Sequence, residues 1–253
     1  MRGSHLSPLN YSLTSNFLPL MKKILILLAT FFAMASQAQN VQLHYDFGHS
    51  IYDELKDTRP KLTSTVEMFR ADKWGSTFFF VDMDYADGEV KSAYWEISRE
   101  LQFWKAPVSI HVEYDGGLNY IKDAYLAGLT YTWNSRDFRN GFTISPMYKY
   151  LRGNDKPNSF QLTGTWRVNF GKGKYSFLGF ADFWREKHTD AKGTEHDLTF
   201  LAEPQFWLNL NAFKGIDKDF KLSVGTEWEI SSNFAVMDGW RWNPTLALKW
   251  TFD

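Results

Sequence analysis

The stretch Gly239-Trp-Arg-Trp-Asn-Pro-Thr-Leu-Ala-Leu-Lys-Trp-Thr-Phe252, almost at the end of the 253-residue chain, alternates apolar and polar side chains. Side chains along a β-strand point alternately to opposite faces, so this period of two predicts a strand with one apolar and one polar face. The apolar parity carries Trp240, Trp242, Leu246, Leu248, Trp250 and Phe252. Aromatic residues gathered on one face are typical of the closing strand of a transmembrane β-barrel, whose outer face meets lipid and carries aromatic girdles.

The same alternation recurs from Val41 onward in about twelve segments bounded by turn residues. The predicted strands are 41–49, 62–70, 74–85, 90–103, 108–115, 125–134, 142–150, 159–170, 175–186, 198–210, 220–230 and 239–252. Outer-membrane barrels have an even strand number, and the turns at the end that holds both termini are short. Even-numbered connections here are mostly brief, and the longest include the odd-numbered 50–61 and 187–197. The sequence therefore predicts an all-β, antiparallel transmembrane barrel of the outer-membrane type with about twelve strands.

Four residues conflict with an unbroken barrel. Pro146, Pro204 and Pro244 fall inside predicted strands, where proline removes a ladder donor and is normally confined to edges or bulges. We therefore expect a bulge or a shifted register at each proline. Arg99 would face lipid, at a cost of about 2–4 kcal/mol near the bilayer midplane. A bulge near Ser98, or a position at the barrel rim, would relieve that cost.

Composition excludes several other classes of protein. The chain has 22 Phe, 12 Tyr and 11 Trp, yet its mean hydropathy is -0.38, whereas a helical membrane protein would be apolar on average. A formal net charge of -1 and the lack of a basic run argue against nucleic acid as a partner. The absence of Cys excludes disulfide frameworks and thiol chemistry.

The amino-terminal region predicts export. Residues 21–38 have the form of a secretory signal peptide: Lys22 and Lys23, then an apolar core at 24–35, then small residues ending at Ala38. The apolar run is too short for a transmembrane helix. Residues 1–20 are interpreted as a tag or an over-extended start. Residues 39–253 are expected to form one barrel in the cell outer membrane, surrounded by lipid and monomeric.

The polar strand faces predict an acidic lumen. By parity the inward acidic side chains are Asp46, Glu67, Asp82, Asp84, Glu96, Glu113, Asp115, Asp182, Glu203, Glu227 and Glu229, and the inward basic ones are mainly Lys149, Arg167, Arg241 and Lys249. Carboxylate-lined pores repel anions and favour cations or neutral polyhydroxylated solutes. The inward aromatic side chains are Phe78, Phe80, Tyr94, Phe180, Trp184 and Trp207. Such rings can stack on a nucleobase for about 1–3 kcal/mol per base, or they can plug a barrel that conducts nothing.

The sequence gives little sign of catalysis. Ser109 and His111 share a strand face, but side chains two residues apart lie about 6.5–7 Å from each other, too far for a nucleophile–base hydrogen bond. His188 and His196 flank a connection that holds Asp190 among other acidic residues. A metal site there is conceivable, but the spacing matches no tight ligand motif, and a solvated loop is the favoured interpretation. We expect no enzymatic activity, no cofactor and no metal.

Three short stretches resemble a known family: Lys73-Trp-Gly-Ser-Thr-Phe-Phe-Phe-Val-Asp82, Tyr175-Ser-Phe-Leu-Gly-Phe-Ala-Asp182 and Lys249-Trp-Thr-Phe252. The chain resembles the Tsx-like outer-membrane proteins, which are nucleoside-specific channels built as twelve-stranded barrels, or a poorly characterised relative of that family of unknown function. Asp253 departs from the aromatic last residue typical of such proteins and leaves Phe252 penultimate. The resemblance implies passive uptake of a small neutral polar solute, with nucleosides first.

The residues predicted to line the solute path are Phe78, Phe80, Asp82, Asp84, Glu96, His111, Glu113, Arg167, Phe180, Asp182, Trp184, Glu203 and Glu227. The alternative hypothesis is a non-conducting outer-membrane barrel with a structural or surface-interaction role. A soluble β-sandwich is disfavoured, because it would need a second sheet to bury the apolar face of every strand.

Overall fold

The computed structural model describes residues 39–119, 121–235 and 237–252. The segments interpreted as a tag and a signal peptide, 1–20 and 21–38, lie outside these residues. The strands of the described part are β1 (Gln39–Asp46), β2 (Leu62–Asp72), β3 (Gly75–Ala86), β4 (Glu89–Leu101), β5 (Val108–Gly117), β6 (Ala124–Asn134), β7 (Asn140–Leu151), β8 (Asn158–Phe170), β9 (Tyr175–Thr189), β10 (Glu195–Ala202), β11 (Gln205–Asn209), β12 (Leu222–Ser232) and β13 (Trp240–Phe252). The short helical elements are α2 (Gly48–Ile51), η1 (Asp53–Leu55), η2 (Gly171–Gly173) and η3 (Leu210–Ala212).

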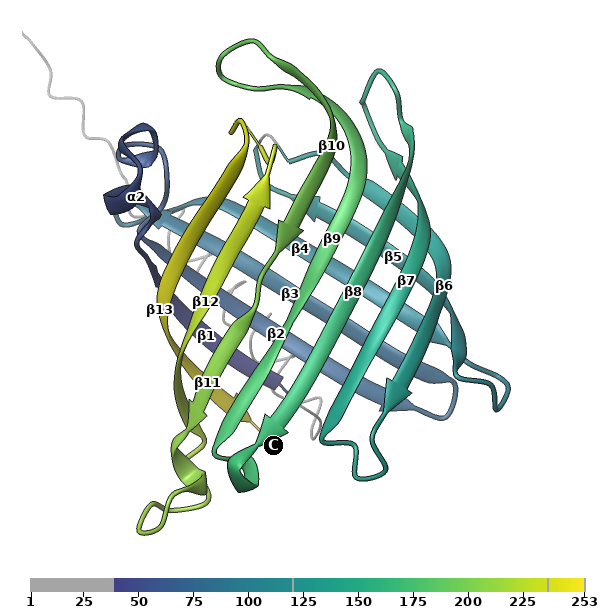
Figure 1. Ribbon diagram of the computed structural model, residues 1–253, viewed down its shortest axis with the longest axis vertical. Helices are drawn as coiled ribbons and strands as arrows, with labels where there is room; N and C mark the ends of the chain where they lie inside the picture. The colour runs from purple at the N-terminus through teal and green to yellow at the C-terminus, as the bar shows by residue number, and fades with distance from the viewer. Residues whose placement is uncertain (1–38, 120, 236, 253) are drawn as a thin grey trace, which may run out of the picture. The chain divides into compact units, whose positions relative to one another are not determined.

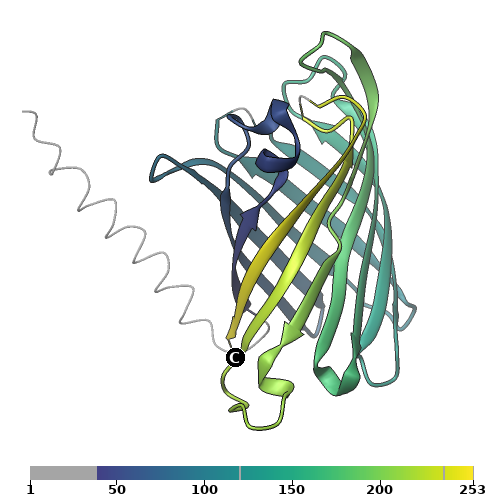
Figure 2. The same ribbon diagram turned by 60° about the vertical axis from the view of Figure 1, so that its left-hand side comes forward.

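The strands form one closed antiparallel sheet (Figures 1 and 2). Each strand from β1 to β9 pairs with the next one in the chain, and β13 closes the circle by pairing with both β12 and β1. β10 and β11 occupy a single position, because each pairs with β9 on one side and with β12 on the other. The barrel therefore has twelve strand positions, which confirms the predicted fold class.

The expectation of a bulge or register shift at each proline is wrong. β10 and β11 keep one register against both neighbours on either side of Pro204. The same holds for the ladders on both sides of Pro146 and for the β12–β13 ladder across Pro244. A proline removes one backbone donor, and a long ladder tolerates that loss without slipping. One real shift lies elsewhere, between Asp84 and Tyr85, and another lies in the β9–β10 ladder.

Arg99 lies at the rim of the barrel, which is one of the two arrangements that the sequence analysis expected. Its guanidinium donates two hydrogen bonds to the carboxylate of Asp72, at 2.7 and 2.9 Å, and a third to Thr77. Asp72 ends β2 beside the turn to β3, and the β3–β4 register runs unbroken past Ser98 to Leu101. The charge is therefore paired at the end of the strands.

Alternation separates an apolar outer face from a polar interior. β1 alternates buried and exposed positions along its length. Leu246 and Leu129 on the outer face are 56% and 51% exposed, whereas inward Gln42 and Thr130 are each 2% exposed. An exposed belt of apolar and aromatic side chains is the composition expected of a surface in contact with lipid. No helix among the described residues has the length and apolar character needed to cross a membrane.

The connections follow the expected division into long and short only in part. The predicted connection 187–197 shrinks to 190–194, because β9 runs to Thr189 and β10 begins at Glu195. The connection between β3 and β4 is only Asp87 and Gly88, and the connection after β11, 210–221, is long and lies at the same end as the carboxyl terminus (Figure 2). The segment 47–61 is the long connection that prediction and structure share.

Candidate functional site

The strand register shows that residues paired with the inward positions of β1 also point inward, and this holds from strand to strand around the whole barrel. Gln42 pairs with Thr65, which pairs with Asp82, which in turn pairs with Tyr94. Followed through every ladder, the same parity holds for all of the predicted lining residues. The structure thus places these side chains on the inner face, while their role in binding a solute stays a prediction.

One acidic cluster lies on β4 and β5. Glu96, Glu113 and Asp115 each bring a carboxylate oxygen within 4.8 Å of the others, and we call them the β4–β5 carboxylate cluster. The hydroxyl of Tyr94 donates to Glu96 over 2.6 Å. The charge of Asp182, which belongs to β9, acts on Glu96 across the lumen. Carboxylates from different strands therefore converge on one part of the interior.

A second group of carboxylates lies on other strands of the barrel. The charges of Asp82 on β3, Glu203 between β10 and β11, and Glu227 on β12 interact with one another. Neutral donors serve two of them, since Thr65 donates to Asp82 and Gln205 donates to Glu227. Both donors are neutral, so neither hydrogen bond pairs its carboxyl group with a positive charge.

Aromatic rings run beside these carboxylates. The ring centroids of Phe78 and Phe80 are 6.0 Å apart, and those of Phe80 and Tyr94 are 5.9 Å apart. Phe80 pairs directly with Glu96 in the β3–β4 ladder. All of these inward side chains on β3 and β4 are only half-buried. Rings and carboxylates on one partly open wall can contact both the face and the hydroxyl edge of a small solute.

Three predicted residues lie apart from this wall. Arg167 is exposed and donates to the backbone carbonyl of Phe138, at the barrel end where Gln39 pairs with Phe252. Asp84 lies toward the other end and accepts hydrogen bonds from Thr63 and Ser92. Trp184 is 7% exposed and donates to a carboxylate oxygen of Glu186. The prediction therefore identified the correct face but joined residues from several levels of the barrel.

Few cations balance the interior carboxylates. Lys149 lies 3.5 Å from Asp115 and donates to Gln161. The ammonium of Lys249 sits 4.0 Å from the ring centroid of Trp207, a cation–π contact. Both lysines were predicted to point inward. The acidic groups on the described part of the inner face outnumber these partners.

Sequence reasoning missed Arg59, which belongs to the 47–61 connection. Its guanidinium binds the carboxylate of Glu229 through two hydrogen bonds of 3.1 and 2.9 Å and donates to Asp46 over 2.9 Å. Desolvation lowers the pKa of Arg59, but the two carboxylates outweigh it, so the pKa rises above its usual range and the group stays charged. A connection has no periodicity, so no pattern in the sequence indicated that this charge folds back onto strand residues.

Sequence reasoning also missed Glu100, whose parity matches that of Glu96. Its carboxylate accepts a hydrogen bond from Ser109 and contacts His111 Nδ1 at 2.6 Å, while His111 Nε2 lies 3.2 Å from Glu113. Ser109 and His111 thus both bond to Glu100, and the nucleophile–base pair that acyl transfer needs is not formed in the described part of the chain. Glu96, Ser98 and Glu100 share one parity on β4, so following the inward positions to the end of the strand would have identified Glu100.

One part of the interior is apolar and closely packed. Ala124 and Leu126 on β6 and Met147 and Leu151 on β7 form a buried cluster in which each residue is at most 5% exposed. Trp207 on β11 is fully buried and donates to Gln205. The sequence analysis did not predict apolar inward residues on β6 and β7. The aromatic side chains that mark these two strands as β-strands point outward.

The closed antiparallel barrel, with its apolar outer face and polar lumen, defines a porin-type architecture. The chain belongs to a family described as a domain of unknown function (DUF5020), whose model matches residues 38–252. No curated protein matches the chain. Among solved structures it is similar to the NanC porin, with a TM-score of 0.55 and 8% identity over 85% of this chain and 100% of that chain. That likeness is one of fold.

Two other solved structures give lower scores. A membrane protein from a study of in-meso crystallization has a TM-score of 0.44 and 6% identity, over 85% of this chain and 83% of that chain. A bacterial polysaccharide outer membrane secretin has a TM-score of 0.33 and 10% identity, over 85% of this chain and 98% of that chain.

Proposed function

We propose that the protein is an outer-membrane channel for passive uptake of small neutral polar solutes, with nucleosides as the first candidates. The observation that carries this proposal is the wall formed by β3 and β4, where half-buried aromatic rings lie beside the carboxylates of Asp82 and Glu96, which accept hydrogen bonds from neutral hydroxyls, inside a closed barrel. The resemblance to Tsx-like channels supports the choice of nucleosides.

The outer face supports a membrane location. Outward strand side chains such as Leu246, Leu129 and Trp242 are 56%, 51% and 50% exposed, and burying such a surface in hydrocarbon is favourable. The predicted signal peptide supports export, and the barrel fold supports the outer membrane as the destination. We propose lipid and a diffusing solute as the partners, and a monomer as the functional unit.

The proposed mechanism is weak binding along the acidic wall. A nucleobase stacks on Phe80 or Phe78, and the ribose hydroxyls donate to the carboxylates of Glu96 or Asp82. Each contact is weak enough to release the solute toward the next site, which passive permeation requires. The carboxylates repel anionic solutes, so a nucleoside should pass more readily than its phosphate ester.

One observation favours the alternative hypothesis of a non-conducting barrel. The packed residues of β6, β7 and β11 fill part of the interior, and Trp207 has no exposed surface. A barrel blocked at that level would have a structural or surface-interaction role in the membrane.

A liposome swelling assay separates the two hypotheses. Vesicles with the refolded barrel should swell in isosmotic solutions of uridine or adenosine faster than in solutions of the matching nucleotides. Phe80→Ala should change the ranking of solutes, whereas Phe183→Ala, on the outward face of β9, should leave it unchanged. Swelling no faster than in empty vesicles, from a barrel that is folded, would contradict the channel.

A further inference from the structure

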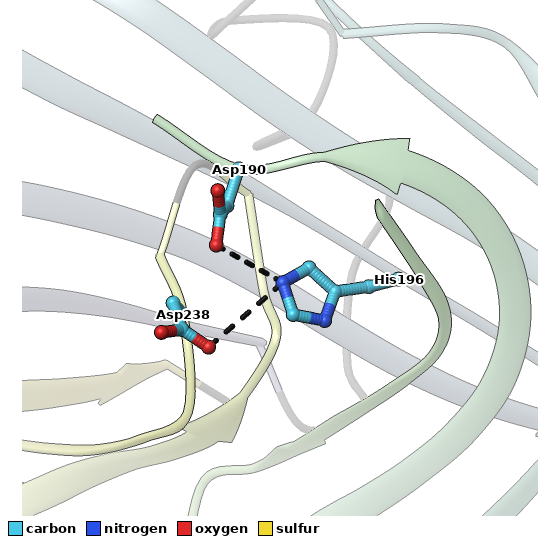
Figure 3. Close-up of side chains that lie close together, drawn as sticks. All are labelled: Asp190, His196 and Asp238. Atoms are coloured by element: carbon cyan, nitrogen blue, oxygen red, sulfur yellow. Dashed lines mark hydrogen bonds and ion pairs between the residues drawn. The ribbon is translucent and has the colours of Figure 1, made fainter. Parts of the chain in front are cut away.

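Three side chains of types that can ligate metals meet at the barrel end opposite Gln39 and Phe252 (Figure 3). Asp190 lies in the β9–β10 connection, His196 in β10 and Asp238 in the β12–β13 connection. The Nε2 atom of His196 is 3.1 Å from Oδ2 of Asp190 and 3.9 Å from Oδ1 of Asp238. One ligand atom from each residue lies within 4.8 Å of the other two. Two connections that are distant in sequence therefore point their ligand atoms at one place.

The remaining carboxylate oxygens are held by other groups. Oδ1 of Asp190 accepts the backbone N–H groups of Lys192 and Thr194 at 2.9 and 2.8 Å, and the Asp190 side chain is 0% exposed. Oδ2 of Asp238 lies 3.4 Å from the ammonium of Lys192. Each carboxylate thus leaves one oxygen directed toward His196, which is the arrangement that a second shell gives to metal ligands.

A neighbouring imidazole provides an independent observation. The Nδ1 atom of His188 lies 3.0 Å from the carbonyl of Glu186, which only accepts, so Nδ1 carries the proton and Nε2 is a free acceptor. That Nε2 atom is buried and has no hydrogen-bond partner in the described part of the chain. The rings of His188 and His196 are 5.4 Å apart. A buried acceptor without a partner is costly, and metal-binding histidines commonly donate their other ring N–H to a carbonyl.

We propose that Asp190, His196 and Asp238 bind a divalent transition-metal ion of the zinc class. His188 serves the fourth coordination position, directly or through a bound water. A tetrahedral zinc ion with bonds of about 2.0–2.1 Å places its ligands about 3.3 Å apart, and the observed 3.1 and 3.9 Å lie on either side of that value. Calcium and magnesium take oxygen ligands, so the imidazole selects against them.

The ion would tie together two connections that already touch. Lys192 in the β9–β10 connection lies 3.4 Å from Asp238 in the β12–β13 connection. His196 also lines a cleft open to solvent, together with Lys156, Lys187, Glu195 and Asp197, so one of the three proposed ligands borders on solvent. The proposal does not depend on conduction, because the three ligands lie outside the aromatic and acidic wall.

Isothermal titration of the EDTA-treated, refolded barrel with zinc chloride tests the site. We expect His196→Gln and Asp238→Asn each to weaken the tightest zinc binding by at least about tenfold. Asp197→Asn removes a neighbouring carboxylate outside the cluster and should leave that affinity unchanged. The heat-dependent gel mobility of each variant confirms that it is folded, and Asp238→Asn changes only a connection.

Cobalt provides a readout of ligand geometry. Tetrahedral Co²⁺ bound by nitrogen and oxygen should give intense visible absorption bands in the original protein and in Asp197→Asn, but not in His196→Gln. Three results would overturn the proposal: equal zinc affinity in the protein and both ligand variants, tighter binding of calcium than of zinc, or loss of zinc binding in Glu113→Gln with the loop variants unaffected.

Discussion

The inner faces of β3–β4 and of β6–β7 belong to one closed sheet, yet they are built differently. On β3 and β4 the inward side chains include aromatic and acidic ones that are only half-buried, as Phe80 and Glu96 are. On β6 and β7 they include Leu126, Met147 and Leu151, at 3%, 5% and 4% exposed. We call these regions the open wall and the packed wall.

The contrast shows that strand alternation decides which face a side chain takes but not how far it is buried. Carboxylates without a cation on the open wall repel one another and must keep contact with water. Apolar side chains on the packed wall gain by excluding water. We therefore place the proposed solute path along the open wall, with the packed wall contributing to the stability of the barrel.

The largest expected effect comes from the packed interior. Trp207→Ala should lower the free energy of unfolding by about 3–5 kcal/mol, because it leaves a cavity where a fully buried indole packs beside His44 and Lys249. Phe80→Ala on the open wall should cost no more than about half as much, because that ring is partly exposed. Urea unfolding in lipid vesicles measures both. Equal losses would show that the depth at which an inward ring is buried does not set its contribution to stability.

The next effect concerns the connection between β1 and β2. Arg59→Gln should destabilise the barrel by about 1–3 kcal/mol, because Glu229 and Asp46 lose their shared cation. It should also increase cation selectivity, since two carboxylates are no longer neutralised. Chemical denaturation measures the stability and reversal potentials measure the cation selectivity. Arg139→Gln in the β6–β7 turn serves as a control for both. An unchanged stability would mean that this ion pair contributes nothing.

Removing charge from the open wall should alter selectivity more than stability. Glu96→Gln combined with Glu113→Gln should reduce the cation-to-anion permeability ratio several-fold, because pore carboxylates exclude anions. Glu89→Gln, an exposed residue at the start of β4, should have no effect. Reversal potentials in a salt gradient measure the ratio. If the double variant keeps the original ratio, the open wall does not line the path.

The smallest effect belongs to the turn that closes the packed wall. The Ser135 hydroxyl and the backbone N–H of Arg139 donate to Asp137 and lower the pKa of its carboxyl. This stabilisation is fully present above the pKa of Asp137 in the unfolded state, about 4. It is lost as the pH falls through the lower pKa of Asp137 in the folded state. The Ser135 hydroxyl also accepts the backbone N–H of Asn140, a hydrogen bond that does not depend on the charge of Asp137. Ser135→Ala should therefore lower Tm more at neutral pH than at a pH at which Asp137 is protonated. A deficit of equal size at both pH values would contradict this origin.

The period-two pattern predicted the strands and their inward faces, because lipid on one side and water on the other impose alternation at every position. It failed at Pro204, where an isolated missing donor leaves the register unchanged. It gave no information on Arg59 or Asp238, because connections have no periodicity and their placement depends on tertiary contacts. The cluster of Asp190 and His196 with Asp238 joins distant segments, so spacing alone left it as a solvated loop.

Single-channel conductance of the refolded barrel in a planar bilayer, titrated with nucleosides, tests the central claim most directly. We predict a small, cation-selective conductance that uridine or adenosine blocks in the original protein and blocks weakly in Phe80→Ala, while the outward Phe183→Ala keeps the original block. A barrel that is folded but shows no conductance would contradict the channel and favour a structural role in the membrane.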